Sequence, residues 1–390
     1  MFPFLLVAQQ KPIRMAACAS GAMLLLVCCL LLGCHTYRFA SPRLRPRPTT
    51  FTTIAAATPA LGLAELEAYH RSQWELFVTH HTGHFFGIQA GYDPEEPTVE
   101  DYLYCEQRLE PSADGSEVKH VSALVLGEIR ADCETCFDSE RLKSKEVGTY
   151  RVGKLKSRLC ANVEVRGPGL TPRGISTELI LRHGDGRVRV LLAHAPVEFA
   201  DVAGVGSVPC VYALKDVVIV RERLGRRPLK ADTDPDVMWV PTADSTFAGP
   251  YDGIRERFGA AGVPEQEAVA FDELPACKVL SEQVQAEMQQ QAGGAEGDHL
   301  ASSVSGGELY RRVFAGGILV EAPWVVAAGL DERARVSWAP CAGASARPVV
   351  VAADIAVRAV TDVATLPAGQ TVLVPPKLVD FFVDTLTRRV

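Results

Sequence analysis

The sequence predicts a mainly β protein whose antiparallel strands form a barrel or a sandwich. Short segments of alternating apolar and polar residues follow one another closely, with turn residues between them. No long helical pattern separates these segments, so the strand–helix–strand units of parallel sheets are not expected. With 47% hydrophobic and 22% charged residues, the composition excludes a mainly disordered or fibrous protein.

The head of the chain has the composition of a targeting leader. Residues 1–64 hold six Lys or Arg and no Asp or Glu. Lys11 and Arg14 precede an apolar run over 21–33, which is shorter than the ~20 residues that cross a bilayer. This pattern predicts a signal peptide over 1–34. The acid-free segment 35–62 is rich in Arg, Pro and Thr, and this predicts a transit peptide.

A signal peptide followed by a transit peptide resembles the bipartite leader of algae with complex plastids. Such leaders commonly carry a Phe soon after the signal core, and Phe39 stands in that place. The resemblance implies location in a plastid and a mature protein that does not span a membrane. Two alternatives stay open. The segment ending at Cys34 resembles a lipoprotein box, and the apolar run could serve as a signal anchor or a plain secretion signal.

Charge separates the leader from the rest of the chain. The whole chain has a formal charge of −7. Removing the six basic residues of the leader leaves 34 basic and 47 acidic residues, or −13. An acidic body argues against nucleic-acid binding, which requires basic surface to replace phosphate counterions.

The first elements of the body are a helix and a series of strands. Leu66, Tyr69, Leu76 and Phe77 have roughly helical spacing, and the pattern ends before Gly83. Strands are then expected at 86–92, 102–109, 118–126, 148–154, 160–165, 176–182, 187–194 and 210–221.

The clearest hairpin runs from Ser176 to His194, with Arg182 opposite Arg187. One of its faces is apolar, carrying Thr177, Leu179, Leu181, Val188, Val190, Leu192 and His194. The other is charged, carrying Glu178, Arg182, Arg187 and Arg189. Alternation of this kind is typical of a sheet with one dry and one wet face, so we expect the arginines to face solvent.

An Asp- and Pro-rich connector over 231–236 marks the expected boundary between domains 63–230 and 231–390. Residues 251–259 are interpreted as a short helix. The Gln-, Gly- and Ser-rich segment 281–307 is interpreted as a flexible insertion. A final segment, 378–387, is amphipathic. Further strands are expected at 309–313, 317–322, 325–328, 334–338, 349–360 and 371–374.

Two short motifs carry a family resemblance. Trp74-Glu-Leu-Phe77 followed by Gly83-His-Phe-Phe-Gly87 resembles the opening of lipocalin-like barrels, although Phe86 stands where lipocalins usually place Trp. Together with the hairpin and with residues 316–323, this opening resembles an uncharacterised plastid and cyanobacterial family of the calycin superfamily, related to phycobilin lyases. The resemblance implies two antiparallel lipocalin-like barrels in tandem, preceded by a short helix and a disordered leader.

A small antiparallel barrel has room for one small ligand. We therefore expect a plastid protein that binds a hydrophobic molecule such as a tetrapyrrole, a carotenoid or a lipid. No catalytic residues and no cofactor are expected, since the GxSxG, HExxH and phosphate-loop motifs are absent from the sequence. Two alternatives are an enzyme resembling a bilin lyase or an isomerase, and an assembly protein that docks on a photosynthetic or pigment protein.

Ligand sites of this kind combine apolar walls with a few polar anchors. His194 is a candidate because it lies on the apolar face of the hairpin; the alternative is a core histidine with its hydrogen bonds satisfied. A second candidate set shares one strand face and would anchor a ligand only if that face points inward: Tyr102, Tyr104, Glu106 and Arg108. Arg182, Arg187 and Arg189 could pair with propionates if they were not solvated.

The body has seven scattered cysteines, which do not form a disulfide framework. Cys133 and Cys136 are their one close pair and are a redox candidate; they could also be two plain thiols or half of a zinc site. Because no second pair follows at zinc-ligand spacing, no metal is expected. His80, His81 and His84 are expected to place favourable charge at the helix C-terminus rather than to bind metal.

Overall fold

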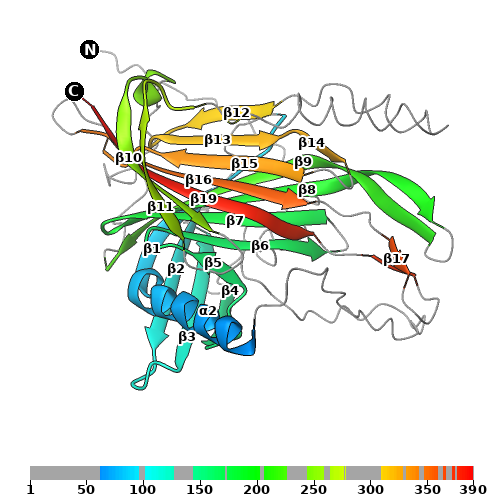
Figure 1. Cartoon of the computed structure of the whole chain (residues 1–390), viewed down its shortest axis with the longest axis horizontal. Helices are drawn as coiled ribbons and strands as arrows, with labels where there is room; N and C mark the ends of the chain where they lie inside the picture. The colour runs from blue at the N-terminus through cyan, green and yellow to red at the C-terminus, as the bar shows by residue number, and fades with distance from the viewer. Residues whose placement is uncertain are drawn as a thin grey trace, which may run out of the picture. The chain divides into compact units, whose positions relative to one another are not determined.

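The computed structural model describes 62–95, 102–126, 144–171, 174–202, 206–225, 244–258, 264–275, 277, 309–327, 331–341, 347–358, 363–365, 371–373 and 376–389. These residues belong to the unit Leu44–Val390. They are mainly antiparallel strands in two large sheets (Figure 1), which confirms the predicted fold class and fits two barrel-like halves. Residues 1–61, the connector 231–236 and the insertion 281–307 lie outside the described residues.

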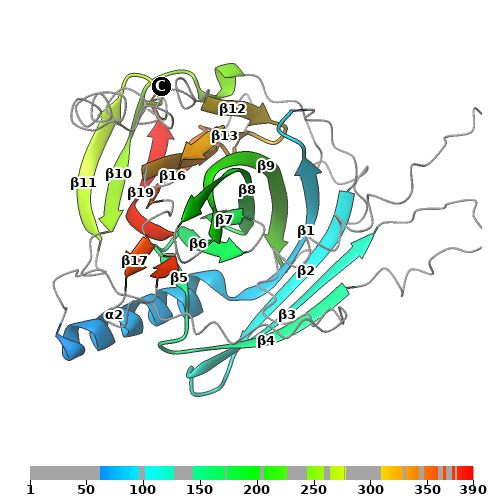
Figure 2. The same cartoon turned by 90° about the vertical axis from the view of Figure 1, so that its right-hand side faces the viewer.

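The first sheet contains ten strands within the described part of the chain, in the order β4-β3-β2-β1-β9-β8-β7-β6-β5, with β14 beside β9. Figure 2 shows this sheet curling from β4 round to β6. Its strands are β1 (Gly83–Tyr92), β2 (Tyr102–Pro111), β3 (Glu117–Leu126), β4 (Ser144–Arg151), β5 (Ser157–Leu159), β6 (Val163–Thr171), β7 (Gly174–His183), β8 (Gly186–Val202), β9 (Gly206–Leu224) and β14 (Val325–Ala327).

Helix α2 (Leu63–Leu76) continues into a π-helical turn, η1 (Phe77–His81). The helical segment therefore ends before Gly83, as predicted. Gln73 Oε1 accepts a hydrogen bond from the Leu159 amide at 2.8 Å, and Trp74 Nε1 donates to the Gly115 carbonyl at 2.6 Å. The helix therefore bridges β5 and the β2–β3 turn, which lie at opposite sides of the curled sheet. Among the described residues, no helix is long and apolar enough to cross a membrane.

The second sheet has seven strands in the described residues, in the order β11-β10-β19-β16-β15-β13-β12. A 3-10 turn, η2 (Asp244–Phe247), precedes it, and β17 (Val363–Thr365) pairs separately with β18 (Thr371–Leu373). The strands of the second sheet are β10 (Tyr251–Phe258), β11 (Glu265–Phe271), β12 (Leu309–Phe314), β13 (Ile318–Pro323), β15 (Asp331–Trp338), β16 (Val349–Arg358) and β19 (Lys377–Arg388).

One hydrophobic core joins the two sheets. It contains Leu179, Val190 and Ile219 from the first sheet with Val320 and Phe381 from the second. Strand β14 belongs to the second half of the sequence, but it pairs with β9 of the first sheet. The apolar face predicted for the 176–194 hairpin is therefore buried, as expected, and the surface that covers it is the second sheet.

Most expected strands are confirmed, including the hairpin register that places Arg182 opposite Arg187. The short helix expected at 251–259 is wrong, because residues Tyr251–Phe258 form strand β10. Its charged residues have partners across the sheet: Arg255 forms a bidentate pair with Asp384 on β19 at 2.7 and 2.9 Å. Gly253 also permits close strand contact, since a Cβ there would lie 2.0 Å from the Thr385 carbonyl oxygen.

Candidate functional site

The concave face of the first sheet carries charged side chains that are shielded from solvent. Arg187 is 1% exposed and Arg189 is 3% exposed, so the prediction that these arginines face solvent is wrong. The predicted strand pairing is right, but the curl of the sheet and helix α2 cover this face. We call the following residues the inner cluster: Glu164, Arg166, Glu178, Arg182, Arg187, Arg189 and Glu222.

Arg187 on β8 is the most enclosed cation of the inner cluster. Its Nε donates to Glu222 Oε2 at 2.7 Å and its Nη2 donates to Gln107 Oε1 at 2.8 Å. The ring centroid of Phe85 lies 3.5 Å from its Cζ, within the range of a cation–π contact. Burial lowers the pKa of Arg187 below its ordinary value, and the Glu222 carboxylate offsets only part of this shift. The remaining nitrogen, Nη1, has no hydrogen-bond partner.

Arg166 and Arg189 join the three carboxylates into one network. Arg166 forms a bidentate pair with Glu164 at 2.6 and 3.2 Å, and lies 3.5 Å from Glu178. Arg189 donates to Glu178 at 3.0 Å and lies 3.1 Å from Glu222. Burial would raise the pKa of Glu164, but Arg166 and His81 outweigh it and hold that pKa at about 2. The neighbouring arginines likewise lower the pKa of Glu222 against the effect of burial, so Glu164 and Glu222 are ionised at neutral pH.

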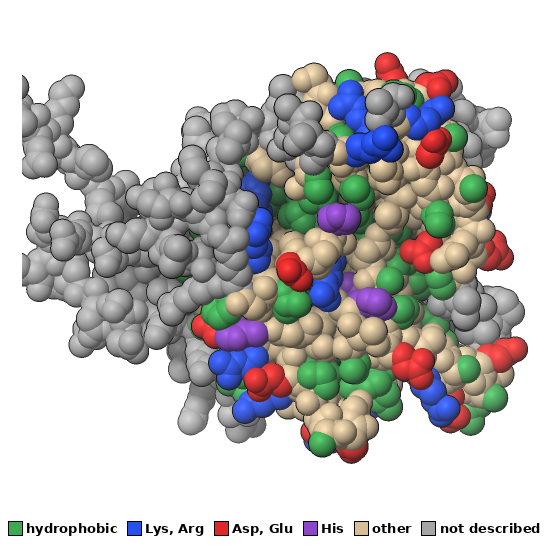
Figure 3. Space-filling model, turned by 90° about the vertical axis from the view of Figure 1, so that its left-hand side faces the viewer, with side chains coloured by type: hydrophobic (Ala, Val, Ile, Leu, Met, Phe, Trp, Pro, Cys, Tyr) green, Lys and Arg blue, Asp and Glu red, His purple; other side chains and the backbone are tan. Residues whose placement is uncertain are grey.

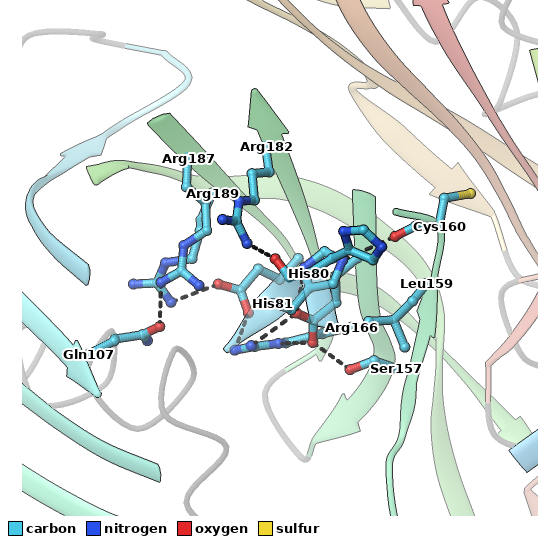
Figure 4. A network of polar contacts seen from close by, with 12 residues as sticks. His80, His81, Gln107, Ser157, Leu159, Cys160, Arg166, Arg182, Arg187 and Arg189 are labelled. Atoms are coloured by element: carbon cyan, nitrogen blue, oxygen red, sulfur yellow. Dashed lines mark hydrogen bonds and ion pairs between the residues drawn. The ribbon is translucent and has the colours of Figure 1, made fainter. Parts of the chain in front are cut away.

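Arg182 lies at the edge of the inner cluster and differs from the other arginines. It is only half-buried, and it donates to the backbone carbonyls of His80 and Gly184. Among the described residues, no carboxylate forms an ion pair with its guanidinium within 4.0 Å; burial lowers the pKa of Arg182, and the longer-range attraction of Asp185 partly offsets this. Figure 4 shows Arg182 beside Arg187 and Arg189, next to the turn that carries His80 and His81.

The π-helical turn places His81 at the base of the inner cluster. His81 is 1% exposed and its Nε2 lies 3.0 Å from the Cys160 carbonyl oxygen. Its Nδ1 lies 3.6 Å from Glu164 Oε2. Burial lowers the pKa of His81 to about 4, so the ring is neutral near pH 7. The expectation that this histidine brings positive charge to the helix C-terminus is therefore wrong.

Strands β1 to β4 form the opposite wall of the concave space. His120, on β3, has its Nδ1 3.5 Å from the Tyr150 hydroxyl, and its Nε2 has no partner. Burial and the nearby positive charges of Arg166, Arg189 and Arg187 lower the pKa of His120 to about 3. Ser122 Oγ and Gln89 Oε1 on the same inner faces also lack partners.

Two glycines show that this wall borders open space. Gly148 on β4 pairs directly with His120 and so shares its inner face. A Cβ built on Gly148 would meet no atom within 4 Å. The same is true of Gly91 on β1, which pairs with Val218 on β9. Gly87, which lies between Phe85 and Gly91 on β1, is tightly packed instead. A Cβ there would lie 2.1 Å from the Arg221 carbonyl oxygen.

The structure does not bring the sequence-predicted ligand residues together. His194 faces the core between the two sheets, where its Nε2 lies 3.0 Å from the Pro323 carbonyl oxygen. Tyr104, Glu106 and Arg108 lie on the outer face of β2, since Cys105 and Gln107 between them point inward and are buried. The backbone of Tyr102 pairs with Ala90, and its side chain lies outside the described set. Ligand binding by these residues stays a prediction.

The predicted redox pair, Cys133 and Cys136, lies outside the described residues. Within the described ranges, no group of three His, Cys, Asp or Glu side chains is placed to hold a metal ion. The three histidines near the helix end have separate partners. The His80 carbonyl accepts from Arg182, His81 contacts Cys160, and His84 lies 2.7 Å from Glu106.

The outer surface offers less specific features. A pocket of about 370 Å³ on the outer face of β2–β4 is lined mainly by polar and charged residues, including Glu110, Glu117 and Lys119. On the face shown in Figure 3, basic side chains lie beside acidic ones. The described residues of that face therefore form no extended patch of one charge for a polyanion to occupy.

The second sheet carries a ladder of alternating charges on the face away from the shared core. Arg311, Glu321, Arg335 and Asp354 are direct cross-strand neighbours on β12, β13, β15 and β16. Arg335 is 2% exposed, and burial raises the pKa of Asp354 to about 6. Opposite charges on facing strands stabilise a sheet, so this ladder has an evident structural role.

These features define a mainly antiparallel β protein whose curled first sheet encloses a charged cluster. No protein-family model and no curated protein matches the chain. Among solved structures it is similar to a protein with unknown function from the DUF3598 family of Nostoc punctiforme, with 13% sequence identity and a TM-score of 0.49. The match covers 81% of this chain and 99% of that one. Because that protein's function is unknown, the comparison names no ligand or activity.

Proposed function

We propose that this protein is a lipocalin-like binding protein that holds one small molecule in the concave space of its first sheet. The observation that carries the proposal is a set of buried polar atoms on the inner faces of both walls that have no hydrogen-bond partner among the described residues. They are Arg187 Nη1, Glu222 Oε1, Gln89 Oε1, His120 Nε2 and Ser122 Oγ.

Unpaired buried polar atoms are costly, at about 1–3 kcal/mol each. Where several face one space, that space holds water or a polar group that satisfies them. The open position at Gly148 supports the presence of such a space, and the exposed position at Gly91 is open toward solvent. The inner faces also carry apolar side chains, which suit a largely hydrophobic ligand such as a tetrapyrrole, a carotenoid or a lipid: Leu103, Ile180, Leu191, Val218 and Val220.

The proposal is tested by ligand capture. The purified full-length protein is incubated with an extract of plastid pigments and lipids, passed through a desalting column and examined by native mass spectrometry. We expect one class of molecule to be retained at about one per chain. Retention of nothing above the level of an unrelated β protein would refute the proposal.

A pair of variants on strand β4 locates the site. Gly148→Leu places a side chain in the open inner space, and we expect it to abolish retention. Thr149→Leu adds a similar side chain to the exposed outer face one residue along, and we expect retention to persist. Circular dichroism of both variants checks that the fold is intact. Equal retention by the two variants would place the ligand elsewhere.

We further propose that the protein acts in the plastid of an alga with a complex plastid, where a photosynthetic or pigment protein would be its partner. The acid-free segment 1–64 supports this location. Residues 1–70 fused to a fluorescent protein should direct it to the plastid of such an alga. Secretion of the fusion would contradict the proposal.

A further inference from the structure

We propose that the molecule held in the concave space is a carboxylic acid, and that its carboxylate binds between Arg182 and Arg187. This inference rests on the proposed function and narrows it to one chemical class of ligand. It is carried by the charge balance of the inner cluster and by the one unused donor group of Arg187.

The inner cluster contains four guanidinium groups and three carboxylates. Glu164 and Glu178 are engaged by Arg166 and Arg189, and Glu222 is shared between Arg187 and Arg189. The three carboxylates thus balance Arg166, Arg187 and Arg189, and the one further positive charge is that of Arg182, on which Asp185 acts from the adjoining turn. The buried Nη1 of Arg187 has no hydrogen-bond partner among the described residues, and a guanidinium donor is best satisfied by an anion, so the Arg182–Arg187 pair is suited to one further anion.

The register places Arg182 directly beside Arg187, the arginine with the unused nitrogen. Arg182 on β7 and Arg187 on β8 are direct cross-strand partners, and like charges directly opposite each other destabilise a sheet. Arg187 already uses Nε and Nη2 for Glu222 and Gln107, and Phe85 covers the face of its guanidinium. Nη1 remains without a partner. An anion that bridges Nη1 and Arg182 offsets the repulsion.

The shape of the site favours a carboxylate on an apolar body. Guanidinium groups bind carboxylates in planar, charge-assisted hydrogen bonds, and a single unmatched charge suits a monoanionic group. Four residues along β8 from Arg187 lies Leu191, paired with Val218 and near the open position at Gly91. This separation is about 13 Å at the rise of an extended strand. A fatty acid or one propionate arm of a linear tetrapyrrole has this form.

The test compares acids with their neutral esters on the full-length protein. The probes are palmitic acid and its methyl ester, and biliverdin and its dimethyl ester, with binding followed by native mass spectrometry and by quenching of tryptophan fluorescence. We expect the acid of one pair to bind at least ~10-fold more tightly than its ester, the gain of about one charge-assisted hydrogen bond. Whether the fatty acid or the tetrapyrrole shows the difference identifies the source of the carboxylate.

Variants assign the effect to the proposed residues. Arg182→Gln is expected to weaken binding of the acid ~10-fold or more and to leave ester binding unchanged, whereas Arg182→Lys should restore part of the acid preference. Arg151→Gln removes an exposed arginine on β4 and is the matched control. Arg182 is half-buried, so its replacement is expected to leave the fold intact, which circular dichroism checks.

The outcomes separate this inference from the proposed function. If acid and ester bind equally well and Gly148→Leu blocks both, the acid inference fails and the binding function stands. If an acid is preferred but Arg182→Gln has no more effect than Arg151→Gln, the assigned residues are wrong and the inference fails. If the extract experiment and all four probes show no binding, both fail together.

Discussion

Glu222 is the carboxylate that Arg187 and Arg189 share, and its replacement tests whether the inner cluster holds the first sheet together. Glu222→Gln keeps the size of the side chain and removes its charge. It leaves two arginines, at most 3% exposed, without the carboxylate that now lies 2.7 and 3.1 Å away. Breaking a buried ion pair by removing one partner costs about 3–5 kcal/mol, so we expect a loss of stability in this range.

The assay is urea unfolding of the full-length protein followed by circular dichroism, with thermal unfolding as a second measure. At about 2 °C per kcal/mol for a chain of this size, the midpoint temperature should fall by about 6–10 °C. Glu117→Gln is the control because it breaks an exposed ion pair with Arg151 at 2.8 Å, and exposed pairs contribute about 0–1 kcal/mol. Equal effects of the two variants would refute the structural role of the cluster.

Three further predictions concern pH, packing and thiol reactivity. Burial lowers the pKa of three histidines below their unfolded value, to about 4, 3 and 4 for His81, His120 and His194. The unfolded chain therefore binds protons between pH 6.5 and 4 that the folded chain does not, and stability falls as the pH falls. Asp354 has its pKa raised to about 6, so near pH 5 the folded chain holds one proton that the unfolded chain does not, and this offsets one of the three histidine protons. The free energy of unfolding, measured in urea near pH 5, should therefore change by about 3 kcal/mol per pH unit. A free energy of unfolding that does not change with pH would contradict this. Gly87→Ala should cost about 1–3 kcal/mol by overpacking, whereas Gly91→Ala, which meets no atom within 4 Å, should be neutral or slightly stabilising; equal unfolding midpoints would show that the two positions are packed alike. Burial raises the pKa of Cys105 and Cys277 to about 12, so peptide mapping after iodoacetamide treatment at pH 8 should find both unlabelled in the folded protein and labelled in urea, and rapid native labelling would argue against their burial.

The sequence predicted the local structure of the first half well, because the relevant signals are local. The turn at 183–186 and the alternation on either side define both the hairpin and the pairing of Arg182 with Arg187. The aromatic residues of α2 and the break at Gly83 define where the helix ends. These features involve residues within about 20 positions of one another, where pattern and turn chemistry are informative.

The burial of the charged face could not be read from the hairpin alone. Its cover comes from β1–β4 and α2, up to about 120 residues earlier in the chain. Charged residues on alternate positions are typical of a solvated face, and the prediction for Arg187 and Arg189 followed that rule. The missed signal was the presence of opposite charges at matching positions on neighbouring strands: Glu164 lies between Val163 and Val165, and Glu222 is in register with Arg187.

The short helix predicted at 251–259 was wrong for a related reason. Five of its eight residues are charged or glycine, a composition that resembles neither a buried strand nor a regular wet face. The partner that stabilises Arg255 is Asp384, 129 residues later. Propensity is a weak guide when a single distant ion pair determines the conformation of a short segment.

The central parts of β7, β8 and β9, at 177–181, 187–194 and 217–220, have no free side. One face lies in the shared core, with Leu179 and Ile219, and the other carries the inner cluster. Mutational tolerance should therefore divide unevenly across the first sheet. In a saturation library, substitutions in these central parts should be depleted at consecutive positions, whereas β2 and β3 should tolerate change at every second residue. Sequence change would thus accumulate on the outer face of β2 and β3, while the strands between the two sheets would stay nearly invariant.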